Sequence, residues 1–89
     1  MAATFQFDLV SPEKKLASAQ VAMVVVPGAE GDFGVLPGHA PMMSTIRPGI
    51  IEIYATEGSS PSARYEIDGG FAEVSADGLT ILAEAATLI

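Results

Sequence analysis

The chain has 89 residues, of which 49% are hydrophobic, and eleven acidic against four basic residues give it a net charge of −7. A chain of this length is expected to form one domain, residues 1–89, that buries about 60–65% of its unfolded surface. The negative field opposes binding to nucleic acid, and the lack of cysteine excludes disulfides and thiol chemistry.

The first half of the chain has the pattern of strands separated by turns. Apolar and polar residues alternate over 4–9, which predicts a half-buried strand that ends at Ser11-Pro12. A second extended stretch is predicted over 16–26, where four valines suit a strand buried on both faces. Residues 27–41 contain four glycines and three prolines, so we expect turns and short extended pieces there.

The middle of the chain continues this pattern with clear turn signals. A strand is predicted over 42–46, and Arg47-Pro48-Gly49 then matches a type II turn, with Pro in the second and Gly in the third position. The next strand covers 51–56, and a polar loop over 57–61 follows it.

The last third of the chain completes an all-β pattern. Strands are predicted over 63–68, 71–75 and 79–83, and Asp77-Gly78 is a strong hairpin signal between the last two. Only residues 83–86 have helical propensity, for the start of a helix at most. Short strands at near-regular spacing predict two packed antiparallel sheets in a sandwich or flattened barrel.

The sequence contains no motif that would place side chains together for catalysis or cofactor binding. His39 is the only histidine, and without a second metal ligand at a suitable spacing its ring is expected to hydrogen-bond the backbone of its own loop. Glu30 and Asp32 lack the ligand series of a calcium loop, and the glycines of 28–34 fit no phosphate-binding motif. We therefore expect no cofactor, no metal and no enzymatic activity.

Several short blocks, in order along the whole chain, resemble the epsilon subunit of the rotary ATP synthase. The most specific block is Leu36-Pro37-Gly38-His39-Ala40-Pro41. The supporting blocks are Val26-Pro27-Gly28 with Gly31 and Gly34, Arg47-Pro48-Gly49, Gly69-Gly70-Phe71 with Glu73-Val74, and Thr80-Ile81-Leu82-Ala83-Glu84.

The resemblance implies a fold, a role and a location. The fold is all-β, a flattened ten-stranded antiparallel β-sandwich or barrel, without the C-terminal helical hairpin that follows in the family, because this chain stops at Ile89. The role is that of a non-catalytic rotor subunit of the central stalk, which couples c-ring rotation to ATP synthesis in the alpha/beta head by docking the gamma subunit and the c-ring. The location is peripheral, on the cytoplasmic face of the cell inner membrane, with membrane contact only through the c-ring.

The resemblance also assigns two groups of site residues. The loop that faces the c-ring is Glu30, Gly31, Asp32, Phe33 and Gly34, with Asp32 at the acidic position. The turn that faces gamma is Pro37, Gly38, His39, Ala40 and Pro41.

Two other functions remain open from the residues alone. A free-standing β-sandwich could bind a small molecule or carbohydrate in a surface groove, although the six aromatic residues mostly fall at alternating strand positions expected in the core. An enzyme would need a metal held by carboxylates alone.

Overall fold

The computed structural model describes residues 3–56, 58 and 60–89, and the regular secondary structure of this part of the chain is all β. The strands are β1 Phe5–Val10, β2 Lys15–Val21, β3 Met23–Gly28, β4 Gly31–Val35, β5 Met42–Ile46, β6 Gly49–Tyr54, β7 Ala63–Ile67, β8 Gly70–Ser75, β9 Gly78–Leu82 and β10 Ala86–Leu88. The ten-stranded all-β fold is therefore confirmed. Among these residues, no helix has the length and apolar character needed to cross a bilayer.

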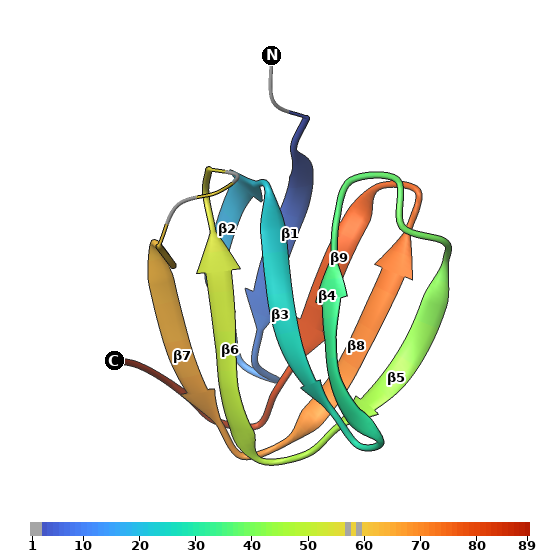
Figure 1. Ribbon diagram of the computed structural model, residues 1–89. Helices are drawn as coiled ribbons and strands as arrows, with labels where there is room; N and C mark the ends of the chain where they lie inside the picture. The colour runs from blue at the N-terminus through green and yellow to red at the C-terminus, as the bar shows by residue number, and fades with distance from the viewer. Residues whose placement is uncertain (1–2, 57, 59) are drawn as a thin grey trace.

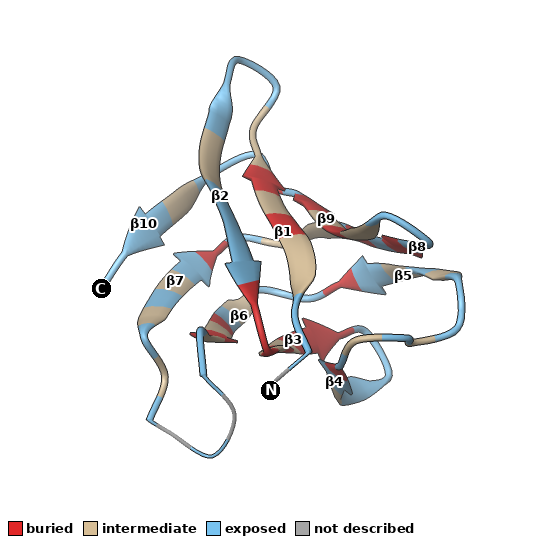
Figure 2. Cartoon of the chain, turned by 90° about the horizontal axis from the view of Figure 1, so that it is seen from above, coloured by how far each residue is buried: buried red, intermediate tan, exposed pale blue. Residues whose placement is uncertain are grey.

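The two layers of the predicted sandwich are the halves of one curled sheet, which face each other across the core (Figures 1 and 2). The strand order is β10-β7-β6-β3-β5-β8-β9-β1-β2, with β4 paired to β3 outside this path. The ladders of the described residues are antiparallel except between β1 and β9, which run parallel with Leu9 opposite Ile81. This parallel pair joins strands from opposite ends of the chain, so no hairpin signal could indicate it.

The core lies between the two halves because alternate residues of each strand point inward, as the buried bands in Figure 2 show. Burial of each large apolar side chain contributes about 1.5–3 kcal/mol. The fully buried large side chains are Phe7, Leu9, Val21, Val24, Val26, Val35, Ile51, Leu79 and Ile81.

The extended stretch predicted over 16–26 is two strands, β2 and β3, separated at Ala22. Ala22 is buried, and its N–H donates to a carbonyl of β6 at 2.7 Å, so the chain passes here from the edge of the sheet to its centre. Val21 and Val24 are both fully buried, which strict alternation along one strand does not allow. The predicted burial on both faces was also wrong, since the outward-facing Val25 is only half-buried.

The chain turns at Arg47-Pro48 between β5 and β6, as predicted, but the turn is not type II. That type needs a positive φ at its third residue, and Gly49 does not have one. Glycine is favoured there by space instead, because a Cβ on Gly49 would lie 3.2 Å from the Cβ of Pro27. The corner packs on the end of β3, where the N–H of Arg47 donates to the carbonyl of Pro27 at 3.0 Å.

Residues 83–86, for which the start of a helix was expected at most, are not helical, and Ala86 is the first residue of β10. Ala86–Leu88 pairs antiparallel with β7, placing Ala86 opposite Ile67 and Leu88 opposite Tyr65. The free edge of β7 supplies the backbone hydrogen bonds of this segment and so favours the strand over the helix.

The predicted loop over 57–61 includes residues 57 and 59, which lie outside the described residues.

The hairpin predicted at Asp77-Gly78 is confirmed by the β8–β9 ladder, in which Ser75 pairs with Gly78 across the turn at 76–77. Gly78 has a φ of +139° and lies against β1, where an added Cβ would be 2.0 Å from the carbonyl oxygen of Gln6. The position accepts only glycine because the backbone of β1 fills the space of a side chain.

We expect Gly78→Ala to lower the free energy of unfolding by more than about 3 kcal/mol, because it adds a steric clash to backbone strain. Gly31→Ala is the matched control, since Gly31 has almost the same φ, +138°, and open space at the Cβ position. It should cost about 1–3 kcal/mol. Urea denaturation followed by circular dichroism measures both values. Equal losses would contradict the close contact between Gly78 and β1.

A polar cluster on the outer face of β1 and β2 surrounds Asp8. The amide of Gln6 donates to Asp8 Oδ1 at 3.1 Å, and Lys15 Nζ lies 3.7 Å from the same oxygen. The hydrogen bond from Ser18 is the main cause that lowers the pKa of Asp8 below its ordinary value of 3.8. Partial burial opposes this effect, and Gln6 and Lys15 add to it.

We expect Ser18→Ala to raise the pKa of Asp8 and to destabilise the domain in a pH-dependent manner. A carboxylate with a lowered folded-state pKa stabilises the fold above its unfolded-state pKa, and this stabilisation is lost as the pH falls through the folded-state pKa. The difference from the parent should be largest at neutral pH and should shrink as the pH falls below 3.8, to the part that is due to the lost hydrogen bond of 2.8 Å from Gln6 to Ser18 Oγ. Denaturation at a series of pH values tests this, with Ser44→Ala on β5 as the control. A difference that does not change with pH would rule out Asp8 as its source.

Candidate docking surfaces

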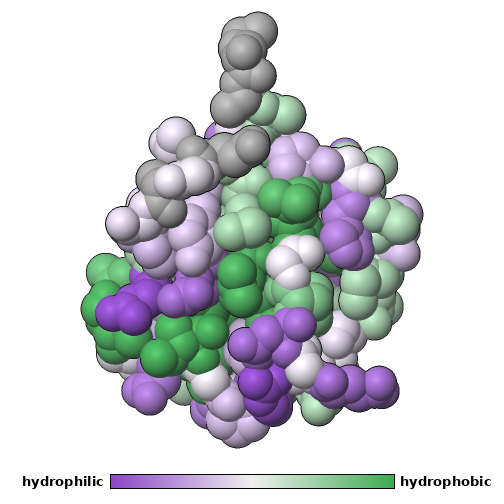
Figure 3. Space-filling model, viewed as in Figure 1, coloured by the Kyte–Doolittle hydropathy of each residue, from purple (hydrophilic) through white to green (hydrophobic). Residues whose placement is uncertain are grey.

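The residues predicted to face the c-ring form the turn and second strand of the β3–β4 hairpin. Glu30 lies in the turn, and Gly31 to Gly34 belong to β4, so this segment is a paired strand rather than an irregular loop. Asp32 is exposed, while Phe33 packs against the core. Figure 3, in the view of Figure 1, shows hydrophilic side chains gathered at the lower end, where this hairpin and the β5–β6 corner lie.

The tip of this hairpin, residues 28–32, is bound to the β5–β6 corner by Arg47. Its guanidinium forms an ion pair of 2.6 Å with Asp32 Oδ1 and also donates to the carbonyl oxygen of Gly28. The side chains of Arg47 and Asp32 are 45% and 62% exposed, so both reach solvent. This contact was not predicted from the sequence, because no local pattern links residues fifteen positions apart.

The turn predicted to face gamma connects β4 to β5. Gly38 adopts a φ of +82°, and the N–H of His39 donates to the carbonyl of Leu36 at 3.1 Å. The His39 ring lies with Nδ1 2.7 Å from the carbonyl oxygen of Ala40, which confirms the predicted hydrogen bond to its own loop. His39 therefore orders the turn.

The structure brings residues of both predicted groups to one open groove of about 580 Å³. Its two sides come from the hairpin tip with β4 and from the turn with β5. The lining residues are Ala29, Glu30, Gly31, Asp32, Phe33, His39, Met42, Met43, Ser44 and Thr45. Pro37, Gly38, Ala40 and Pro41 do not line it.

A row of apolar side chains crosses the outer face of β8, β9 and β1, and we call Val10, Phe71 and Leu82 the apolar row. Val10 is half-buried, and the other two residues are exposed. Phe71 lies opposite Leu82, and Leu82 lies opposite Val10, so the three residues share one line across the sheet. Phe71 and Leu82 are 53% and 49% exposed. Beside the row, β5 exposes Met43.

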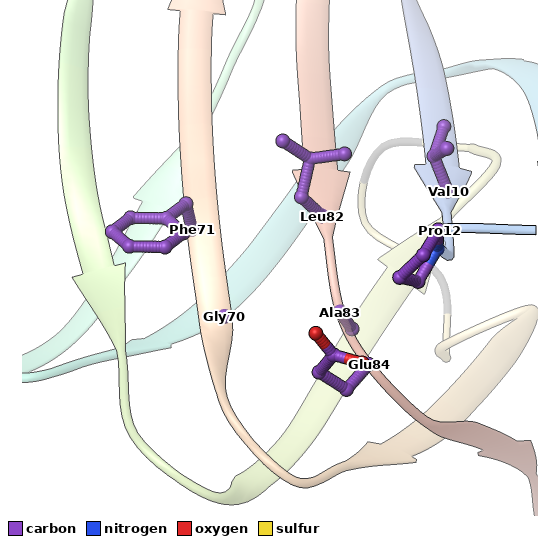
Figure 4. Close-up of a pocket in the computed structure, with 7 residues that line it drawn as sticks. All are labelled: Val10, Pro12, Gly70, Phe71, Leu82, Ala83 and Glu84. Carbon is purple, nitrogen blue, oxygen red and sulfur yellow. The ribbon is translucent and has the colours of Figure 1, made fainter.

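A pocket of about 230 Å³ lies along the apolar row (Figure 4). Pro12 extends it beyond Val10, and Glu84 stands at its lower side in this view. An exposed aromatic residue beside a small apolar pocket is typical of a surface that receives a side chain of a partner protein.

The apolar row was missed in the sequence, although one signal was present. Phe71 alternates with Ala72 and Val74 in β8, whose side chains are buried, so it shares the outer face with Glu73. Phe71 is thus an exception to the expectation that the aromatic residues lie in the core.

The titratable side chains of these surfaces do not form a cluster that could bind a metal ion, among the residues that the structure describes. Within residues 3–56, 58 and 60–89, no cluster of three or more His, Asp or Glu residues could hold a metal ion. The described features are an acidic hairpin tip, an ordered turn and an apolar row.

Comparison with known proteins identifies the family. Residues 4–89 match the family model of the ATP synthase delta/epsilon chain, β-sandwich domain. The ATP synthase epsilon chains of Rhodospirillum centenum and Parvibaculum lavamentivorans are 59% and 61% identical to this chain, over 98% and 94% of its length and 60% and 62% of theirs. This chain therefore spans about three fifths of the length of these relatives.

Solved structures show the same fold. A chain in the Euglena gracilis mitochondrial ATP synthase, OSCP/F1/c-ring in rotational state 1, matches with a TM-score of 0.85 and 30% identity, over 97% of this chain and 54% of that one. A chain in the Tetrahymena thermophila mitochondrial ATP synthase central stalk/c-ring structure matches with a TM-score of 0.76 and 18% identity, over 96% of this chain and 66% of that one, and it shows the fold alone. The family match over nearly the whole sequence, together with the ten-stranded sandwich, shows that this chain belongs to the ATP synthase delta/epsilon chain family as its β-sandwich domain.

Proposed function

We propose that this chain is the β-sandwich of an epsilon subunit that is not itself catalytic and that couples c-ring rotation to ATP synthesis in the alpha/beta head. Its direct partners are the gamma subunit and the c-ring, and it acts peripherally at the cytoplasmic face of the inner membrane. The similarity to proteins named as ATP synthase epsilon chains supports this role, as does the likeness to chains of central stalk and c-ring assemblies.

The observation that carries the proposal is the exposed apolar row, which we assign to the gamma interface. Large aromatic and aliphatic side chains at the centre of an interface supply most of the binding energy. The row and the turn predicted to face gamma are linked through paired strands, because residues 37–41 lead into β5 and β5 pairs with β8. Phe71 lies opposite Thr45, toward the end of β5 that is farther from this turn.

The hairpin tip is assigned to the c-ring. It lies at one end of the sandwich, where Glu30 and Asp32 are exposed, and it is held by backbone pairing and by Arg47 (Figure 1). The ion pair with Arg47 uses Oδ1 of Asp32, and a carboxylate has a second oxygen with which to accept a hydrogen bond from a basic residue of the ring.

The structure disfavours a free-standing module for small molecules or carbohydrates. The pocket beside Phe71 has about 230 Å³, which is below the ~300–1,000 Å³ of ordinary ligand sites. The open groove of about 580 Å³ falls within that range, but Phe33, the one Phe, Tyr or Trp among its lining residues, packs against the core. Among the described large hydrophobic residues that are exposed, Phe71 is the one aromatic, whereas a sugar groove usually presents several stacking rings.

We expect Phe71→Ser to weaken binding of the full-length epsilon chain to purified gamma at least tenfold, about 1.4 kcal/mol, since an interface residue of this kind is a binding hot spot. The fold should survive, because Phe71 is already half exposed. Ile50→Ser is the matched control, because Ile50 is an exposed residue of β6, outside the apolar row. Quantitative pull-down measures both variants. Equal retention of Phe71→Ser and the parent would remove the apolar row from the interface.

We expect Asp32→Ala to weaken c-ring docking by less than about sixfold, because a rim ion pair contributes only ~0–1 kcal/mol. Asp32→Lys should lower ATP-driven proton pumping clearly, since like charges at an interface can cost several kcal/mol. Pumping is measured in reconstituted membranes at low salt and at about 1 M salt, where a Debye length of ~3 Å should give partial rescue.

Asp77→Lys is the matched control for this charge reversal, because Asp77 lies in the β8–β9 turn at the opposite end of the sandwich (Figure 1). It should pump like the parent. If Asp32→Lys also pumps like the parent at low salt, Asp32 does not lie at the ring interface.

A further inference from the structure

We propose that Arg47 is a positioning residue that ties the hairpin tip to the sheet carrying the apolar row, so that the two docking surfaces move as one body. This inference rests on the proposed function, because it concerns how the ring-facing and gamma-facing surfaces are connected.

Arg47 holds both strands of the hairpin at once. Its backbone N–H donates to the carbonyl of Pro27 at 3.0 Å, and its guanidinium donates to the carbonyl of Gly28, both at the end of β3. The same guanidinium reaches Asp32 Oδ1 on β4 at 2.6 Å. A guanidinium is planar and carries five donors in fixed directions, so it can bridge two acceptors and fix their relative position.

The same corner leads directly to the apolar row. Arg47 follows β5, in which Thr45 lies opposite Phe71 of β8. Thr45 also accepts a hydrogen bond from the N–H of Ala29 in the tip at 2.9 Å. Hydrogen bonds between the tip and β5, and between β5 and β8, therefore connect the tip to the apolar row. Arg47 adds a second connection between the tip and the end of β5.

The expected consequence of this contact is local order. Arg47 and Asp32 are both about half exposed, so solvent screens their ion pair and it adds little to global stability. The contact instead fixes the direction in which the tip projects, and an ordered tip loses less entropy on docking than a mobile one. A rotor element also transmits torque only to the extent that its two contact surfaces do not move relative to each other.

The test uses the full-length epsilon chain, free and in the reconstituted ATP synthase, with three variants. Arg47→Gln removes the charge and the fork of donors, while its backbone N–H can still bind Pro27. Arg47→Lys keeps the charge without the planar fork. Arg64→Gln is the matched control, because Arg64 is an exposed arginine on β7, which β6 separates from the hairpin strand β3.

For Arg47→Gln we expect amide hydrogen exchange at residues 29–32 to rise about two- to fivefold, as for loss of a surface ion pair. Exchange in β1 and β9 and the affinity for gamma should stay unchanged, while ATP-driven proton pumping falls. Arg47→Lys should lie between Arg47→Gln and the parent in both exchange and pumping, and Arg64→Gln should match the parent.

Three results would overturn the proposal: unchanged exchange at the tip, a rise that is equal throughout the sheet, or a loosened tip with normal pumping. Failure of the proposed function looks different. In that case Asp32→Lys and Phe71→Ser would pump and bind like the parent, whatever the exchange at the tip.

Discussion

The parallel contact between β1 and β9 joins strands from the beginning and the end of the domain and extends the sheet from β8 to β2, and the rest of the fold depends on it. Leu9 and Ile81 lie opposite each other and are both fully buried, so this ladder adds core surface as well as hydrogen bonds. Without it, β1 and β9 would each present a free edge, which favours aggregation. This contact requires glycine at position 78, because the backbone of Gln6 occupies the space that a side chain would need.

The same contact determines the outer surface. The register that places Leu9 opposite Ile81 also places Val10 opposite Leu82, while the β8–β9 ladder places Phe71 beside Leu82. Three side chains from distant parts of the sequence thus form one line on the outer face, with Phe71 and Leu82 exposed and Val10 half-buried. A shift of register by one residue would turn these side chains toward the core and the buried ones toward solvent, so core packing protects the arrangement of the apolar row.

The sequence predicts those parts of the structure that depend on near neighbours. Alternation over 4–9 and 71–75 identifies β1 and β8, and Asp77-Gly78 identifies the hairpin between β8 and β9. Local patterns do not indicate which distant strands pair, so the parallel β1–β9 contact was missed. For the same reason the sequence favoured the start of a helix at residues 83–86 and did not indicate β10, since the strand state of β10 depends on the free edge of β7.

In the candidate site, too, features that depend on near neighbours were predicted, and contacts between distant residues were not. The ring-facing and gamma-facing groups were assigned from short motifs, and the ring of His39 was expected to bond its own loop because it had no other partner nearby in the sequence. The ion pair between Arg47 and Asp32 joins positions brought together only by the β5–β6 corner. The apolar row required the register of several strands.

The ion pair at the hairpin tip also changes how the charge of the protein should be read. A net charge of −7 suggests an electrostatic docking surface, yet Arg47 partly neutralises Asp32 at the very point assigned to the ring. Exposed charges mainly steer partners toward each other and select among them, while buried aromatic and aliphatic contacts supply affinity. The tip is therefore suited to a contact defined by shape and direction, and the apolar row to holding the domain on its partner. This division fits a coupling element, which must stay attached on one side and keep a fixed geometry on the other.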